Sequence, residues 1–184
     1  KSCMSADESK TPGTSPLYPA LEPFDTGMLD VGDGHQIYWE ASGNRQGRPA
    51  LFLHGGPGGG CNRDHSRLFN PQTYMIVLFD QRGCGRSTPH CELQANTTQH
   101  LIDDIERLRA MLQVRDWLVL GGSWGAALAL AYGQQHPQRV RGLILRGVFA
   151  ARQCEIDWLY AEGGASALFP DAWERFAHAI PAAE

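Results

Sequence analysis

Short apolar runs alternate with polar, glycine-rich and helix-forming segments along most of the chain. The runs contain mostly Val, Ile, Leu and Phe, which is typical of strands buried on both faces of a sheet; they cover residues 50–54, 74–80, 116–122 and 140–148. Between them, 96–114 places Leu and Ile on one helical face, and 123–135 is rich in Ala and Leu. Asn96 is the expected N-cap of the first helix, with Gln99 at the third position. This alternation predicts an α/β fold with a mostly parallel sheet and helices on both faces.

A different alternation precedes these runs. Ile37 and Trp39 alternate with more polar neighbours, which is the period of a half-buried strand. The expected strands are 28–31 and 35–41, and Gly32-Asp33-Gly34 between them contains the Asp-Gly pair that favours a tight hairpin turn. We therefore expect an N-terminal antiparallel hairpin at one edge of the sheet.

The two ends of the chain lack this pattern. Residues 1–16 are polar and predict a disordered N-terminal arm, whereas 17–150 predict the α/β core. After Val148 the strand pattern stops, and 155–160 and 171–180 predict short helices rich in Trp, Phe and Ala. We interpret residues 151–184 as the beginning of a helical cap domain.

Composition and charge argue against several classes of function. The chain has 184 residues and a net charge of -4 without a basic cluster, so nucleic acid is not an expected partner. No apolar run reaches the roughly 18 residues of a membrane span, and the polar N-terminus lacks the apolar core of a signal peptide. The five cysteines are irregularly spaced without a CxxC pair, which favours reduced thiols and a cytoplasmic location.

The strongest candidate for chemistry is Gly121-Gly122-Ser123-Trp124-Gly125, which fits the pattern G-x-S-x-G. An apolar strand precedes it and a helix follows, so Ser123 would lie on a tight turn that presents its hydroxyl at the carboxyl end of a parallel strand. Small residues are needed two positions before and after such a serine to avoid collisions. We predict that Ser123 is a nucleophile; the other interpretation is a solvent-facing serine on a glycine-rich turn.

A second candidate follows the strand at 50–54, where His54-Gly55-Gly56-Pro57-Gly58 forms a loop with accessible backbone amides. A serine hydrolase needs an oxyanion donor from such a loop and another from the residue after the nucleophile. Gly56 and Trp124 are the expected donors. We expect His54 to brace the loop by hydrogen bonding rather than to act as a base.

Two other interpretations of this loop fail on its sequence. A phosphate-binding P-loop requires Gly-Lys followed by Ser or Thr, whereas Gly60 is followed by cysteine. The potential metal ligands nearby match no zinc spacing pattern; they are His54, Cys61, Asp64 and His65. We therefore expect no metal and no cofactor.

A third glycine-rich segment, FDQRGCGRSTPH, follows the strand at 74–80. Asp80 and Arg82 are expected to pair and to hold this loop. Cys84 lies between two glycines, and we interpret it as a packed small residue rather than a nucleophile because no base is evident for it.

Together, LHGGPGGG, LFDQRGCGRS and GGSWGAALALAY resemble, in order and spacing, the motifs of bacterial proline iminopeptidases (prolyl aminopeptidases), serine peptidases of the α/β-hydrolase superfamily. The resemblance runs from about Leu17 through the predicted cap helices. HGGPG with GGSWG separates this family from lipases, and the serine separates it from dehalogenases and epoxide hydrolases, which carry aspartate at the nucleophile position.

The resemblance implies a serine aminopeptidase that releases N-terminal proline from peptides through an acyl-enzyme on Ser123. Gly56 and Trp124 would hold the oxyanion through their backbone amides, and Phe149 would line the pocket for the proline ring. From the residues alone, Phe149 is equally consistent with a place in the core. Peptides with an N-terminal proline are the expected partners, and the sequence does not set the oligomeric state.

The chain departs from this family in its catalytic partners. In this fold the acid and the histidine follow the serine and come after later strands. After Ser123 the only histidines are His136 and His178, and neither follows a predicted strand. We therefore expect an N-terminal portion of the enzyme, with C-terminal strands missing and the triad Asp and His beyond Glu184. Two alternatives stay open: another α/β-hydrolase esterase or amidase, and a non-catalytic truncated fragment.

Overall fold

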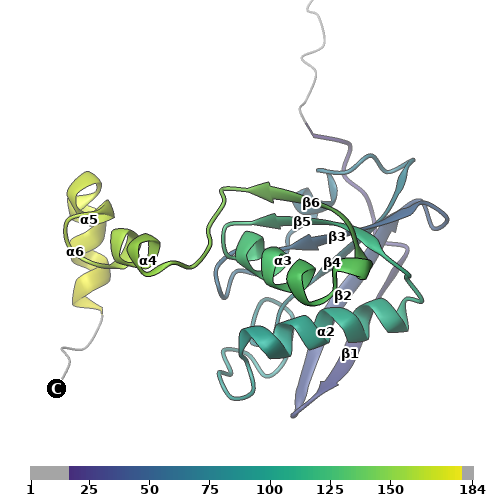
Figure 1. Ribbon diagram of the computed structural model, residues 1–184, viewed down its shortest axis with the longest axis horizontal. Coiled ribbons are helices and arrows are strands. Elements are labelled where there is room, and N and C mark those ends of the chain that lie inside the picture. Colours follow the sequence, from purple (N-terminus) through teal and green to yellow (C-terminus); the bar gives the residue numbers. More distant parts are fainter. Residues whose placement is uncertain (1–16, 180–184) are drawn as a thin grey trace, which may run out of the picture.

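The computed structural model describes residues 17–179, in which six strands form one sheet (Figure 1). The strands are β1 (Asp25–Gly32), β2 (His35–Gly43), β3 (Arg48–Leu53), β4 (Tyr74–Phe79), β5 (Trp117–Gly122) and β6 (Val140–Arg146). Their order in space is β1-β2-β4-β3-β5-β6. The predicted N-terminal arm, residues 1–16, lies outside the described residues.

The N-terminal hairpin forms an edge of this sheet. β1 and β2 pair antiparallel with Gly32 opposite His35, and the turn residue Asp33 adopts a φ of 56°. β2 is also antiparallel to β4, whereas β4, β3, β5 and β6 run parallel to one another. The predicted α/β fold with a mostly parallel sheet and an antiparallel edge hairpin is confirmed.

The two faces of the sheet are covered unequally in the described residues. The helices of this part are α1 (Arg63–Ser66), α2 (Thr98–Met111) and α3 (Trp124–Gln135), followed by a 3-10 turn, Pro137–Arg139. Because strand residues alternate between faces, Leu51 and Val77 pack with α2 and α3, while Phe52 and Leu78 point to the other face. There Phe52 stacks on His65 of the short helix α1, with ring centroids 4.2 Å apart. The two long helices thus share one face (Figure 1).

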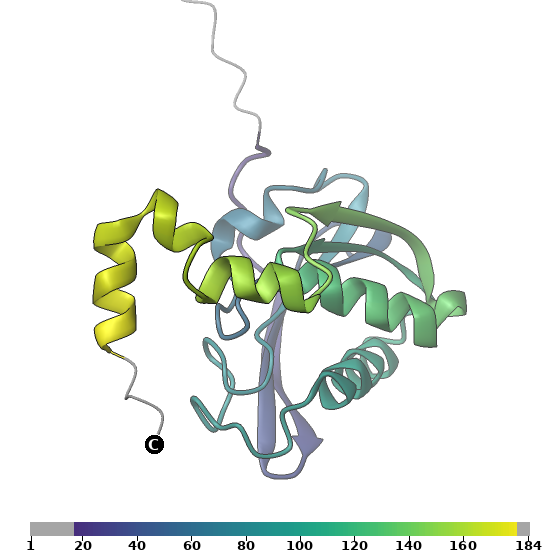
Figure 2. The same ribbon diagram turned by 60° about the vertical axis from the view of Figure 1, so that its left-hand side comes forward.

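Three short helices follow β6: α4 (Gln153–Tyr160), α5 (Ala165–Leu168) and α6 (Pro170–His178). The helices predicted at 155–160 and 171–180 are thus present, although Ile180 lies outside the described residues. α5 and α6 stand apart from the sheet in both views (Figure 1, Figure 2), and Trp158 and Phe169 are 50% and 62% exposed. No helix within residues 17–179 is long and apolar enough to cross a membrane.

Two of the element boundaries that differ from the sequence predictions have a clear local reason. The N-cap of α2 is Thr97 rather than Asn96, and the ring of His100 accepts the Thr97 amide at 3.3 Å. Asn96 instead donates its side-chain amide to the carbonyls of Arg82 and Glu92, at 3.1 and 3.0 Å. β6 ends at Arg146, before the predicted residue 148, because Gly147 turns the chain with a φ of 53°.

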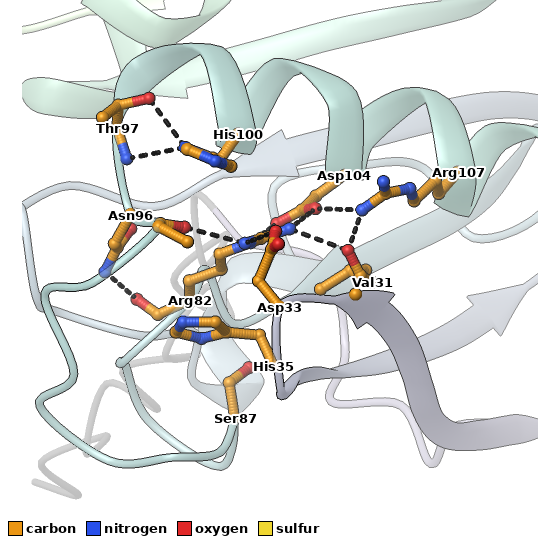
Figure 3. A network of polar contacts seen from close by, with 12 residues as sticks. Val31, Asp33, His35, Arg82, Ser87, Asn96, Thr97, His100, Asp104 and Arg107 are labelled. Atoms are coloured by element: carbon orange, nitrogen blue, oxygen red, sulfur yellow. Dashed lines mark hydrogen bonds and ion pairs between the residues drawn. The ribbon is translucent and has the colours of Figure 1, made fainter.

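The loop after β4 is held by Arg82, whose side chain is fully buried (Figure 3). Asp104 of α2 accepts two of its hydrogen bonds, at 2.7 and 2.8 Å, and Asp33 accepts one at 3.2 Å. The backbone carbonyls of Val31 and Ala95 accept the remaining two, at 2.8 and 2.7 Å. Every N–H of the guanidinium therefore has an acceptor, which joins the hairpin turn, the loop and α2.

The predicted pair between Asp80 and Arg82 is wrong. Asp80 instead accepts hydrogen bonds from the Arg86 side chain at 2.8 Å and from the backbone amides of Cys61 and Arg86, at 2.6 and 2.9 Å. The two side chains lie on opposite sides of the sheet, because Asp80 bonds to Cys61 on the α1 side and Arg82 reaches α2. Asp80 and Arg82 therefore form ion pairs with different residues, Arg86 and Asp104.

The hydrogen bonds of Asp80 predict a loss of stability in acid. Burial opposes ionisation of this carboxyl, but the hydrogen bonds from Arg86 and Cys61 outweigh it and hold its pKa below the ordinary value. The stability from ionised Asp80 is thus present above the unfolded pKa and is lost as the pH falls through the lower folded pKa. Urea unfolding of the full-length gene product should show a free energy of unfolding that falls from pH 7 to pH 3. In Asp80→Asn this fall should be smaller. An unchanged slope in Asp80→Asn would contradict the assignment.

Candidate active site

Ser123 connects β5 to α3 in a backbone conformation that few non-glycine residues adopt, with φ 55° and ψ -121°. The sequence predicted that the helix starts at Ser123, but α3 starts at Trp124 and Ser123 precedes it. The flanking glycines permit the turn. A Cβ on Gly121 would collide with the backbone of Gly125, and one on Gly125 would collide with the carbonyl of Leu53. The packing of the turn therefore requires the spacing G-x-S-x-G.

This turn lies at the N-terminus of α3, where backbone amides point away from the helix. Trp124 is the first helical residue, so its N–H has no carbonyl one turn earlier within the helix. The amide of Ser123 donates to the carbonyl of Arg146 on β6 at 3.0 Å, which ties the serine backbone to the neighbouring strand. The positive end of the helix dipole favours an anion at this position.

The glycine loop after β3 passes directly beside Ser123. A Cβ on Gly55 would lie 3.3 Å from the Cβ of Ser123 and 3.1 Å from the carbonyl oxygen of Gly122. Gly56 has a φ of 130°, and a Cβ there would lie 2.5 Å from the nitrogen of Gly58. Only glycine fits this conformation, which brings the loop backbone to the serine.

His54 braces this loop, as the sequence predicted. It is 1% exposed, and its Nε2 accepts the amide of Gln81 at 3.0 Å. Its Nδ1 lies 2.8 Å from the carbonyl oxygen of Gly55 and 3.1 Å from the amide nitrogen of Gly60. Burial lowers the pKa of His54, which keeps the ring neutral. With both nitrogens occupied, His54 is not available to Ser123 as a base.

The four residues singled out from the sequence line one cavity of about 410 Å³. Ser123, Gly56, Trp124 and Phe149 share its wall with side chains of α4. Ser123 and Phe149 also border a neighbouring cavity of about 390 Å³ that extends toward Val148. The structure thus brings the serine, the two residues expected to supply oxyanion amides and the aromatic residue together, and it places Phe149 at a cavity rather than in the core.

One wall of this cavity was not predicted from the sequence: it comes from α4, which lies in front of the end of the sheet where α3 begins (Figure 2). Ile156, Leu159 and Tyr160 line the cavity of Ser123. Their spacing of i, i+3 and i+4 places them on one face of a helix, so the apolar pattern alone contained this signal.

No described residue supplies a base to Ser123. Neither cavity that Ser123 lines contains a histidine within the part of the chain that the structure describes. His136 caps the far end of α3, and the 12 residues of that helix separate it from Ser123 by about 18 Å. His178 lies on α6, away from the sheet (Figure 1). Glu155 borders the second cavity, but its carboxylate accepts the amides of Ala150 and Arg152.

Other reactive groups near the loops have structural partners. Cys84 is 6% exposed and its thiol donates to the carbonyl of Arg82 at 3.2 Å. Burial raises the pKa of this thiol, as expected for a packed cysteine rather than a nucleophile. Within residues 17–179, no three His, Cys, Asp or Glu side chains gather as potential metal ligands.

Comparison with protein families finds the alpha/beta hydrolase fold over residues 49–183. A proline iminopeptidase from Arabidopsis thaliana is 58% identical over 165 residues, which are 90% of this chain and 43% of that protein. A proline iminopeptidase from Xylella fastidiosa is 56% identical over 168 residues, 91% of this chain and 53% of that protein. The chain therefore spans about half the length of these curated relatives.

Solved structures show the same fold. The proline iminopeptidase-related protein from Thermus thermophilus matches with a TM-score of 0.55 and 32% identity over 66% of this chain and 43% of that chain. An epoxide hydrolase from Vigna radiata matches with a TM-score of 0.62 over 83% of this chain and 54% of that chain. At 23% identity, the second likeness concerns the fold alone.

Proposed function

Because this chain belongs to the alpha/beta hydrolase fold family, we propose that the protein containing it is a serine aminopeptidase that releases N-terminal proline from peptides. The observation that carries the proposal is the shared cavity of Ser123, Gly56, Trp124 and Phe149. The proline iminopeptidase names of the relatives above support the choice of substrate.

In the proposed reaction, the Oγ of Ser123 attacks the carbonyl carbon of the N-terminal proline, and its proton passes to a general base. The carbonyl electron pair moves to oxygen, and the oxyanion accepts hydrogen bonds from the amides of Gly56 and Trp124. Collapse of this intermediate breaks the C–N bond while the protonated base gives its proton to the leaving nitrogen, which releases the shortened peptide as an amine. Water then attacks the ester on Ser123, frees proline and restores the hydroxyl.

The rest of the site is assigned by the same proposal. Phe149 and the side chains of α4 form an apolar wall for the proline ring. We assign α4, α5 and α6 to the beginning of a cap over the cavity, because α4 already supplies part of its wall. Among the described residues, no histidine that could act as the general base lines the cavities of Ser123. We assign the general base and its acidic partner to the part of the full-length protein that this chain does not span. A cytoplasmic location stays a prediction.

The proposal is tested by substrate preference in the full-length gene product. Proline p-nitroanilide should be hydrolysed at least about 10-fold better than alanine p-nitroanilide, judged by kcat/KM, because an apolar pocket discriminates by about 10- to 200-fold. Phe149→Ala should reduce that preference. Equal rates on the two anilides, or hydrolysis of p-nitrophenyl acetate alone, would favour a different esterase or amidase on the same scaffold.

A further inference from the structure

Gln81, two residues after β4, connects the glycine loop to the nucleophile turn through three hydrogen bonds. Its backbone N–H donates to His54 Nε2 and its side-chain Nε2 donates to the carbonyl of His54, both at 3.0 Å. Its side-chain Oε1 accepts the indole Nε1–H of Trp124, also at 3.0 Å. One side chain therefore joins segments that are far apart in the sequence.

The two segments that Gln81 joins carry the two amides assigned to the oxyanion. His54 is two residues before Gly56, and Trp124 supplies the second amide itself. The direction of the bonds is fixed, because a carbonyl can only accept and an indole N–H can only donate. A carboxamide satisfies both partners at once, whereas an apolar side chain satisfies neither.

Gln81 is 2% exposed, so its effect on a substrate must pass through these neighbours. We propose that Gln81 is a positioning residue: its carboxamide sets the spacing between the amides of Gly56 and Trp124, and thereby the fit of the oxyanion. The inference rests on the proposed role of Ser123. Oxyanion donors act only over a narrow range of distances, so a small shift lowers kcat more than it changes KM.

The test begins with Gln81→Met in the full-length gene product, because methionine has a similar length but neither donates nor accepts strongly. We expect kcat to fall by roughly 10- to 100-fold with KM within about 3-fold of its original value. Affinity for a boronic acid that forms a tetrahedral adduct on the serine should fall by a similar factor, while affinity for free proline should not change. A rise in KM alone, or an unchanged kcat, would overturn the proposal.

A double-mutant cycle tests whether Gln81 affects kcat through its hydrogen bond to the indole of Trp124. Trp124→Phe removes the indole donor but keeps the backbone amide. The kcat of the double variant with Gln81→Met should therefore be only slightly lower than the kcat of the less active single variant. Fully additive losses would contradict a route through the indole.

The matched control is Ser87→Ala, which removes a buried hydroxyl from the same loop. Ser87 bonds to the carbonyl of Asp80 and the amide of Tyr38, and to neither oxyanion segment. It should lower the free energy of unfolding but leave kcat unchanged. The ¹⁵N-labelled indole resonance of Trp124 should move in Gln81→Met and stay in Ser87→Ala, which reports the contact independently of activity.

A parallel assay on p-nitrophenyl acetate separates this inference from the proposed substrate. If the original protein cleaves the ester but not the prolyl anilide, the aminopeptidase proposal fails. The effect of Gln81→Met on the ester kcat then still decides the role of Gln81.

Discussion

Ser123→Ala in the full-length gene product should reduce kcat on proline p-nitroanilide by roughly 10⁴- to 10⁶-fold, because loss of a nucleophile removes the covalent route entirely. Ala has the same Cβ as Ser, so the turn at φ 55° experiences the same steric conditions in both proteins. The free energy of unfolding should therefore change by less than about 0.5 kcal/mol. Substrate affinity should also persist.

The matching control is Ser166→Ala, which removes a serine hydroxyl that accepts the amide of Gly163 in the C-terminal helices. This variant should retain its activity. A fluorophosphonate probe should label the original protein and Ser166→Ala but not Ser123→Ala. Equal hydrolysis rates in Ser123→Ala and the original protein would exclude Ser123 as the nucleophile.

Arg82→Met should destabilise the fold by about 3–5 kcal/mol, the typical cost of leaving one partner of a buried ion pair without the other. The substitution removes the guanidinium from Asp104, whose side chain is fully buried (Figure 3). It also removes the side-chain donor of the Ala95 carbonyl and one of the two arginine donors of the Val31 carbonyl. Urea unfolding of the full-length gene product measures the loss.

Arg107→Met provides the comparison, because Arg107 bonds the same Asp104 and the same Val31 carbonyl from an exposed position. Its loss should cost less than about 1 kcal/mol, as is usual for exposed ion pairs. In the double variant Arg82→Met with Asp104→Leu, part of the stability should return, because no uncompensated carboxylate remains. A cost for Arg82→Met no larger than that for Arg107→Met would refute the central role of Arg82.

The contrast between Ser123 and Arg82 shows what local sequence can predict. The turn at Ser123 was predictable because its steric demands fall on residues two positions away, Gly121 and Gly125. The partner of Arg82 was not, because Asp104 is 22 residues away and only the docking of α2 brings it near. A neighbouring acid, Asp80, was the natural expectation, but the fold turns it to the opposite face.

The start of α2 follows the same rule, because its cap depends on contacts with a separate loop. Asn96 is a good N-cap by residue type, but its amide is already used by the loop carbonyls of Arg82 and Glu92. The strands were predictable because burial alone selects their composition. Gln81 stood inside a recognised motif without a predicted role, since its two partners come from separate loops.

The hydrogen bond from the Ser123 amide to Arg146 links the nucleophile to the last strand of the described sheet. Leu143 and Ile144 of that strand, β6, are 37% and 46% exposed. Within the described residues, β6 pairs with β5 on one side only. Each opening of β6 would free the Ser123 amide, so its rate of exchange with deuterium reports how long the serine keeps the geometry on which its reactivity depends.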